Sequence, residues 1–234
     1  MLIDIFNWQI PFWVKLAVVA IFAVTLMIAI IPHEVSHGWV ALKCGDPSAK
    51  LAGRLTVNPM KHLEPMGILS MCLIGVGWAK PVPVNPFNYK NFKKGNFLVS
   101  SAGIVTNLIL AFVFSCGLFF CAKYIGGGHS FWSVDFNKVN VWLFLLFAFF
   151  ELAVLINIAF MLFNLLPIFP LDGYNILVSF TKPDNKFMNF MRVNSMWVLL
   201  VAIAVLYFTS IFGVVRGGIM DGFDWWWGVV FAWL

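Results

Sequence analysis

Long apolar stretches alternate with polar loops along this chain. Four stretches are long enough to cross a membrane: residues 16–42, residues 97–120, a stretch that begins near residue 141, and residues 195–212. A spanning helix needs about 20 residues, at about 1.5 Å per residue, to cross a hydrocarbon core of about 30 Å. The pattern therefore predicts an all-α membrane protein with about four transmembrane helices.

One shorter apolar region does not fit a simple span. Residues 65–78, PMGILSMCLIGVGW, are short for a span, and the proline-rich KPVPVNP follows at residues 80–86. We interpret this region as re-entrant or interfacial, because non-helical backbone at membrane depth must be covered by protein or water. Residues 77–84 are the best candidate for a short β-strand edge that pairs with an extended substrate, although Pro81 and Pro83 cannot donate hydrogen bonds. An ordered loop is the alternative.

The C-terminal residues 224–234, DWWWGVVFAWL, form an aromatic tail that is too short to span a membrane. Tryptophan suits the membrane interface, where the ring lies partly in the apolar layer and its N–H stays in contact with water. We therefore interpret the tail as a plain interfacial anchor.

The composition agrees with a chain whose main solvent is lipid. Of the 234 residues, 62% are hydrophobic and only 11% are charged, and the mean hydropathy is +0.91. A soluble domain carries about 25% charged residues. We expect a single membrane-embedded domain over residues 1–234, with no room for an appended globular domain.

The net charge of +5 is not a sign of nucleic-acid binding, because the basic residues lie in loops between apolar segments. In such loops basic residues set the orientation of the protein in the membrane. Eleven of the fifteen lie in the long loop after the first span and in the loop after the third, and four lie on the opposite side. Positively charged loops stay cytosolic, so we expect both termini outside the cytosol and a multi-pass protein of the inner or plasma membrane. The eleven are Lys43, Lys50, Arg54, Lys61, Lys80, Lys90, Lys93, Lys94, Lys182, Lys186 and Arg192; the four are Lys15, Lys123, Lys138 and Arg216.

The first span carries the polar motif HEVSH at residues 33–37. On a helix, positions i and i+4 lie about 40° apart around the axis, so His33 and His37 can offer imidazole nitrogens to one metal ion. Glu34 is rotated by about 100° from His33, beside such a metal, where a general base for a metal-bound water is needed. Ionisable residues at the centre of a span cost about 2.5–3.5 kcal/mol each. This cost favours a functional over a structural role for the motif.

A catalytic zinc site usually has three protein ligands and a water, so two histidines leave a third ligand to be found. Depth in the membrane favours Asp172. It lies ten residues before Lys182, and His33 lies ten residues before Lys43, which puts both about 15 Å inside the membrane. Glu151 lies too far toward the opposite face and Asp184 lies in a loop, whereas His62 and Glu64 stay open because their loop can fold back.

Asp172 also follows a break in the third span. The stretch NLLPIFPLDG, residues 164–173, contains Pro167 and Pro170, which stop a regular helix. Gly173 permits backbone conformations that are closed to other residues. A carboxylate can turn inward at such a break; an incidental aspartate in a bland break is the alternative.

The two motifs together resemble the site-2 protease family of intramembrane zinc metalloproteases, peptidase family M50. HEVSH and NLLPIFPLDG match the family's two motifs, and GDPSAKLAGRLTVNPMKHLEPMG, GWAKPVPVNP and SAGIVTNL resemble its compact members without PDZ or CBS domains. The resemblance covers roughly residues 30–180. It implies one zinc ion per chain on His33, His37 and Asp172, with Glu34 as the catalytic base that activates a water.

The resemblance also implies a transmembrane protein as substrate, cleaved within or near its membrane-spanning segment, while the oligomeric state stays unknown. Asn164 matches an asparagine implicated in holding substrate, and Asn157 lies two turns before it on the same helix face. Either amide is a candidate substrate-binding or oxyanion-binding group. A hydrogen bond between helices is the alternative for both, and also for Asn107 in the second span.

Two other classes of function fit some of these features. A transporter or channel would explain ionisable residues inside the membrane, but not the zinc spacing of the two histidines with Glu34 between them. A catalytically silent scaffold that binds membrane proteins would not need Glu34. The sequence therefore favours an intramembrane zinc metalloprotease.

Overall fold

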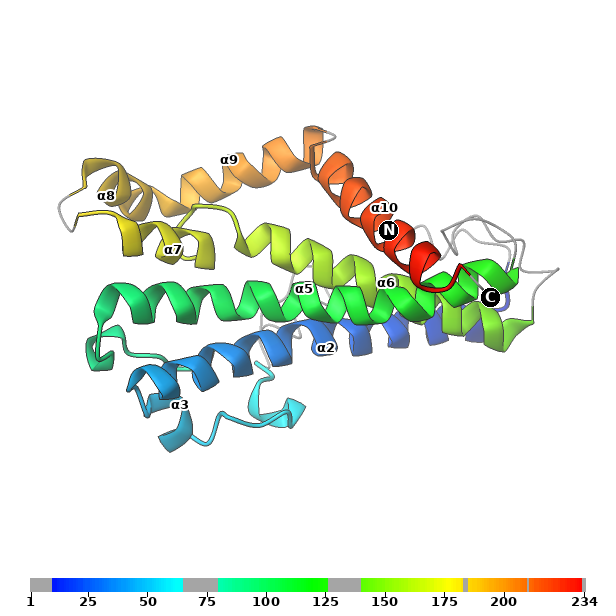
Figure 1. Ribbon diagram of the computed structural model, residues 1–234, viewed down its shortest axis with the longest axis horizontal. Coiled ribbons are helices and arrows are strands. Elements are labelled where there is room, and N and C mark those ends of the chain that lie inside the picture. The colour runs from blue at the N-terminus through cyan, green and yellow to red at the C-terminus, as the bar shows by residue number, and fades with distance from the viewer. Residues whose placement is uncertain (1–9, 65–79, 126–139, 183–184, 210, 233–234) are drawn as a thin grey trace. The chain divides into compact units, whose positions relative to one another are not determined.

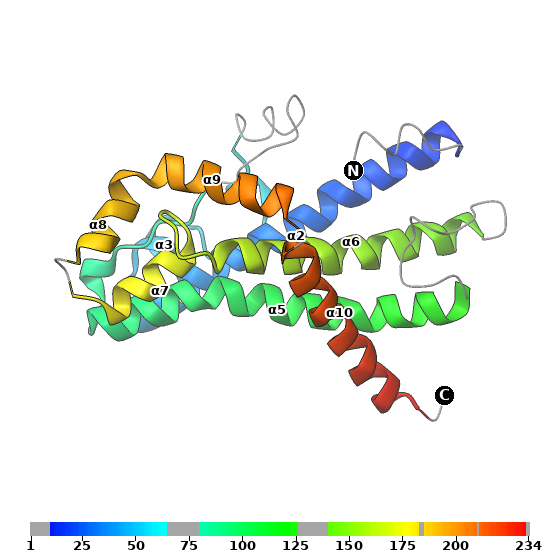
Figure 2. The same cartoon turned by 90° about the horizontal axis from the view of Figure 1, so that it is seen from above.

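The computed structural model describes residues 10–64, 80–125, 140–182, 185–209 and 211–232. These residues form helices and irregular connections, with no β-strand among them (Figures 1 and 2). The prediction of an all-α protein is confirmed. The helices are α2 (Phe12–Cys44), α3 (Ser48–Leu51), η1 (Pro59–Lys61), η2 (Pro86–Asn88), α5 (Phe92–Ile125), α6 (Val141–Asn164), α7 (Asp172–Phe180), α8 (Lys186–Val193), α9 (Ser195–Phe208) and α10 (Ile211–Val230).

Three helices, α2, α5 and α6, are long and apolar enough to cross a membrane. They match the first three predicted spans. The fourth predicted span, residues 195–212, is interrupted, because α9 ends at Phe208 and α10 begins at Ile211. Helix α9 is long enough to count as a fourth span only when it is joined with α8, and the two helices are bent by 83° relative to each other.

Two sequence predictions fall in or next to segments outside the described residues. The re-entrant segment at residues 65–78 lies outside them entirely. Of the candidate strand at residues 77–84, the described part from Lys80 onward is irregular and pairs with no strand. Pro81 and Pro83 offer no N–H to a ladder, and the Val82 N–H between them is given to a side chain, the carboxylate of Glu34.

The chain divides into two compact units. The first comprises Met1–Ala29, Leu108–Ala159 and Gly213–Leu234, and the second comprises Ile30–Asn107 and Phe160–Phe212. In the first unit the C-terminal tail is part of α10, where the Trp227 indole donates a 2.7 Å hydrogen bond to Ser115 Oγ and stacks on Phe112. The tail is therefore packed on α5 and is more than the plain anchor that its sequence predicts.

In the second unit, α7 lies beside the first turns of α5 (Figures 1 and 2). The Asn96 amide of α5 donates to the Asn175 carbonyl at 2.6 Å and to Ser179 Oγ at 3.0 Å, both on α7. Tyr174 of α7 is buried with Met188 of α8 and donates to its carbonyl oxygen. These contacts fix α7, and therefore its first residue Asp172, against α5.

The loop after α2 is held by one buried carboxylate, Asp46. Its oxygens accept hydrogen bonds from Ser48 Oγ at 2.5 Å, from the Asn85 N–H at 2.6 Å and from the Asn88 amide at 2.8 Å. Burial alone would raise the pKa of Asp46, but these hydrogen bonds outweigh it and hold the pKa below its usual value. Asp46 thereby joins the end of α2 to the segment that precedes α5.

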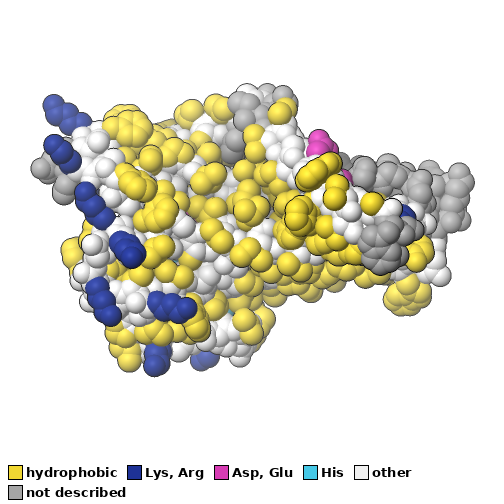
Figure 3. All heavy atoms as spheres, in the orientation of Figure 1, with side chains coloured by type: hydrophobic (Ala, Val, Ile, Leu, Met, Phe, Trp, Pro, Cys, Tyr) yellow, Lys and Arg dark blue, Asp and Glu magenta, His cyan; other side chains and the backbone are white. Residues whose placement is uncertain are grey.

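Lys and Arg side chains gather over the loops of the second unit, where α3, α8 and the start of α5 lie (Figure 3). The ammonium of Lys43, in the last turn of α2, lies 4.4 Å from the centre of the Trp39 ring. A basic residue beside an exposed tryptophan is typical of the end of a membrane span.

Candidate metal centre

Both histidines of the HEVSH motif lie on one face of α2, in the second unit. His33 and His37 are separated by four residues, and their Nε2 atoms are 3.0 Å apart. The two side chains are buried, with 3% and 9% of His33 and His37 exposed. The helix continues through Pro32, so the one-turn spacing expected from the sequence is kept.

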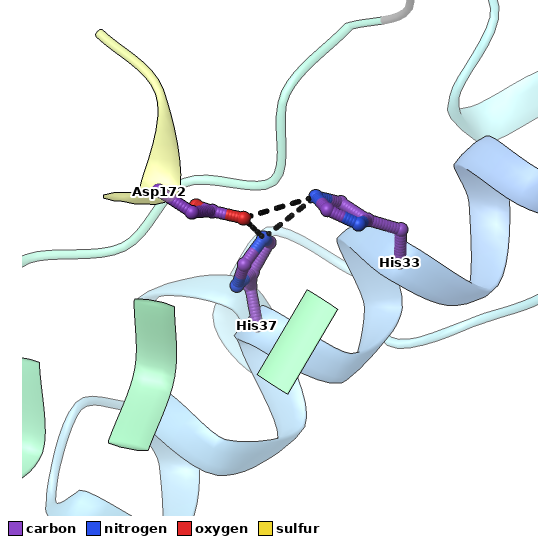
Figure 4. A group of neighbouring side chains, drawn as sticks. All are labelled: His33, His37 and Asp172. Atoms are coloured by element: carbon purple, nitrogen blue, oxygen red, sulfur yellow. Dashed lines mark hydrogen bonds and ion pairs between the residues drawn. The ribbon is translucent and has the colours of Figure 1, made fainter. Parts of the chain in front are cut away.

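The break after α6 brings the third candidate ligand to the same point. α6 ends at Asn164, before Pro167 and Pro170, and α7 begins at Asp172. The Asp172 Oδ2 atom lies 3.3 Å from Nε2 of His33 and 3.3 Å from Nε2 of His37. Figure 4 shows the carboxylate directed toward both imidazole rings.

Glycine is required at residue 173 because the backbone there lies close to the backbone at the end of α6, and not because of an unusual backbone conformation, as the sequence suggested. Its φ is not positive. A Cβ at this position would instead overlap the carbonyl groups of Leu165 and Leu166, with the Leu165 carbonyl carbon 2.6 Å away. A side chain at residue 173 would therefore push α7, and with it Asp172, away from the end of α6.

The other ring nitrogens of the two histidines are also occupied. His33 Nδ1 is 2.5 Å from Oδ1 of Asn107, and His37 Nδ1 is 2.7 Å from the carbonyl oxygen of Val99. Both partners are oxygen acceptors on α5, so each Nδ1 carries the proton and each Nε2 presents a lone pair. Asn107 is fully buried, and it makes the hydrogen bond between helices that the sequence gives as its alternative role, although the sequence does not name His33 as the partner.

With both imidazoles neutral, three lone-pair atoms therefore face one another. The two Nε2 atoms and Asp172 Oδ2 lie 3.0–3.3 Å apart, and Oδ2 is buried without a hydrogen-bond donor. Ligands held at about 2.0–2.1 Å by a tetrahedral zinc ion are about 3.3 Å from each other. The spacing and the lone pairs fit such an ion. Among the described residues this is the group of His, Cys, Asp or Glu side chains that can hold a metal.

Gly103 of α5 makes room for the His33 ring. A Cβ built on Gly103 would be 2.6 Å from both ring nitrogens of His33. The glycine has nothing to do with a turn, since it lies inside a helix. It allows the imidazole to lie against the α5 backbone, with the ring edge of Phe160 on another side at 5.3 Å between centroids.

Glu34 is not one of the three candidate ligands, and its carboxylate contacts the segment before η2. Its Oε2 accepts a 2.9 Å hydrogen bond from the Val82 N–H. The role of Glu34 as the catalytic base stays a prediction.

The remaining candidate residues are not among these three ligands. His62, which the sequence leaves open as a third ligand, is fully buried, and its Nε2 lies 2.7 Å from the Thr56 carbonyl oxygen. Asn164 and Asn157 each donate to the carbonyl four residues earlier in α6, Phe160 at 3.0 Å and Ala153 at 2.8 Å. Asn164 belongs to the second unit and Asn157 to the first. Their roles in binding substrate stay a prediction.

Replacing Asn107 with leucine should lower zinc affinity by about 10- to 100-fold, because the acceptor that fixes the His33 tautomer is lost while the side-chain volume is nearly kept. Asn107→Asp keeps an acceptor at the same place and should retain zinc. The measurement is competition with a chromophoric chelator on the purified variants. Equal affinities of the leucine and aspartate variants would show that the Asn107–His33 hydrogen bond does not hold the ligand.

Comparison with known proteins agrees with this geometry. Residues 21–207 match the family model described as Peptidase family M50. This chain belongs to peptidase family M50. It is 39% identical to YwhC of Bacillus subtilis over 160 residues, which are 68% of each chain, and that protein carries the name of a zinc metalloprotease. It is 26% identical over 179 residues to Rip2 of Mycolicibacterium smegmatis, also named as a zinc metalloprotease; the match covers 74% of this chain and 61% of that one. No solved structure matches the chain.

Family membership and the apolar helices together define the class of protein. It is an integral membrane zinc metalloprotease, and proteases of this family act on membrane-protein substrates within the bilayer. The resemblance drawn from the HEVSH and NLLPIFPLDG motifs is thereby confirmed, as are the predictions of a hydrolase and of a zinc cofactor.

Proposed function

We propose that His33, His37 and Asp172 hold the catalytic zinc ion of this protease and that Glu34 is its general base. The observation that carries this assignment is the convergence of three lone-pair atoms within 3.0–3.3 Å of one another. Hydrogen bonds to Asn107 and Val99 place the proton of each neutral imidazole at Nδ1, so each Nε2 offers a lone pair. A cation is the partner that such a group of acceptors lacks.

Each residue of the centre has a separate role in peptide hydrolysis. A bound zinc ion would lower the pKa of a water to about 7 and polarise the scissile carbonyl. The Glu34 carboxylate would accept a proton from the water whose oxygen bonds to the carbonyl carbon, and would give it to the amine released when the C–N bond breaks. Asn107 and Val99 keep the imidazoles in the tautomer that binds metal, and burial of His33 and His37 strengthens the electrostatic interactions of the site.

The substrate we propose is a transmembrane segment of another protein, opened locally so that a peptide bond reaches the centre. His33 lies eleven residues before the end of α2 at Cys44, about 16 Å along the helix, which is a position inside the bilayer. Asn164 uses one amide N–H for Phe160 and keeps a second for a substrate carbonyl. Asn157, two turns earlier on α6, is the second candidate contact.

The orientation we propose follows the positively charged loops. All eleven basic residues of the two long loops belong to the second unit, which also contains the candidate centre. Under the positive-inside rule these loops are cytosolic, so the site opens toward the cytosol from the inner or plasma membrane.

The proposal is tested by mapping cleavage in proteoliposomes. The purified protein, reconstituted with a panel of single-span proteins that bear N- and C-terminal tags, should produce fragments whose new ends lie within or next to the span, as measured by mass spectrometry. Chelation of zinc should stop cleavage and added zinc should restore it. Cleavage confined to soluble loops, or unaffected by chelation, would contradict the proposal; metal transport without cleavage would favour a transporter.

A further inference from the structure

Arg54 is a buried cation without a carboxylate partner among the described residues. Only 6% of the residue is exposed, and its Nε has no hydrogen-bond partner. Removing a charged group from water without an opposite charge is costly, so such a group is retained where its hydrogen bonds serve a purpose. Arg54 is one of the eleven basic loop residues, and its burial separates it from exposed members such as Lys50 and Lys61.

The guanidinium holds one short segment of backbone. Nη2 of Arg54 donates to the carbonyl oxygen of Lys80 and, at 3.2 Å, to that of Pro81. The Lys80 N–H in turn donates to the His62 carbonyl at 2.8 Å. Residues 80 and 81 are therefore fixed from both sides by the loop that follows α2.

This segment has one backbone donor to offer, and it offers it to Glu34. Pro81 and Pro83 have no N–H, so Val82 is the sole backbone donor of residues 81–83. Its N–H lies 2.9 Å from Oε2 of Glu34. The hydrogen bond thus fixes one oxygen of the Glu34 carboxylate.

Close packing around Gly38 of α2 also fixes Val82 and the loop that contains Arg54. A Cβ on Gly38, four residues after Glu34, would lie 2.7 Å from Leu55 Cδ2, 2.8 Å from Ala49 Cβ and 2.9 Å from Val82 Cγ1. Val82 and the loop residues Ala49 and Leu55, on either side of Arg54, therefore pack directly on α2, one helical turn from Glu34. A shift of the loop would move Val82 relative to the carboxylate.

We propose that Arg54 is a positioning residue for the general base: it holds the Lys80 and Pro81 carbonyls so that the Val82 N–H orients the Glu34 carboxylate. The inference rests on the proposed role of Glu34. Arg54 touches neither the candidate zinc ligands nor a reacting atom, and acts through residues 80–82. Its neutral replacement should therefore reduce turnover and leave the zinc site filled.

The first test is hydrogen exchange at Val82, which does not depend on activity. Because Pro81 and Pro83 carry no amide hydrogen, Val82 is the one exchanging amide between Lys80 and Val84, and the difference between overlapping peptides that begin before and after residue 82 reports on it. In the full-length protein in detergent, Arg54→Met should speed exchange of Val82 by at least about tenfold, because a hydrogen bond to a charged group is lost, and Glu34→Ala should do the same. Lys61→Met, an exposed basic residue of the same loop, is the matched control and should leave exchange unchanged.

The second test separates positioning from folding or substrate binding. Arg54→Met should lower kcat by about 10- to 100-fold with KM and zinc content near those of the wild type, since small displacements of a catalytic group cost rates of this order. Arg54→Lys should recover part of the loss, because a single nitrogen makes both hydrogen bonds.

Several results would overturn the inference. In Arg54→Met, these are exchange of the Val82 amide at the wild-type rate, an unchanged kcat, or a loss of activity explained by lost zinc or by a raised KM. A kcat for Arg54→Lys no higher than that of Arg54→Met would also overturn it. An unchanged kcat in Arg54→Met would leave the proposed function standing, whereas normal cleavage by a Glu34 variant would remove the proposed function itself.

Discussion

Glu34→Gln is expected to lower peptide-bond cleavage by about 100- to 10,000-fold, the range attributed to a lost general base. Glutamine is close in shape to glutamate and can keep a contact with the Val82 N–H, but its amide takes no proton from a water. The fold and the three candidate ligands are untouched. Zinc content should therefore stay at one ion per chain while turnover of a transmembrane substrate falls.

The control for this variant is Glu64→Gln, a change of the same kind in the loop after α2. It should cleave at the wild-type rate. If Glu34→Gln retained full activity with zinc bound, another group would be the base. If it lost zinc instead, Glu34 would belong to the metal site and the three-ligand assignment would be incomplete.

Asp172→Ala is expected to lower zinc affinity by more than about 100-fold, beyond the range seen when only an outer partner of a ligand is lost. The substitution removes one of three protein ligands and leaves two histidines whose Nε2 atoms are 3.0 Å apart. Zinc remaining after dialysis against a weak chelator, measured by atomic emission, gives the result directly. Activity should be lost in parallel.

The comparison variants are those of the rival ligands. His62→Gln and Glu64→Gln should retain zinc, because His62 faces Thr56 and neither residue belongs to the group that can hold a metal. Full zinc in Asp172→Ala, together with zinc loss in either comparison variant, would move the third ligand to the loop after α2.

The sequence predicts those parts of the site that depend on local geometry. The separation of His33 and His37 by four residues fixes their relative position once the helix forms. Pro167 and Pro170 explain why α6 ends at Asn164. Depth in the membrane favours Asp172 as the third ligand before any fold is known, although it leaves His62 and Glu64 open. Long apolar stretches predict α2, α5 and α6 because each alone satisfies the length needed to span a bilayer.

The contacts between distant segments could not be predicted in the same way. Asn107 is 74 residues from His33, and Val99 is 62 residues from His37, so their pairing depends on how α5 packs on α2. The close contacts of Gly103 with the His33 ring and of Gly173 with the end of α6 also depend on packing, and the spacing of apolar residues along the chain does not reveal them. The same holds for buried His62 and for the Trp227–Ser115 hydrogen bond.

X-ray absorption at the zinc K-edge of the purified wild-type protein tests the ligand set most directly. The assignment of His33, His37 and Asp172 predicts a first shell of nitrogen and oxygen at about 2.0–2.1 Å, outer-shell scattering from two imidazoles, and no sulfur. A sulfur shell at about 2.3 Å, or scattering from one or three imidazoles, would contradict it.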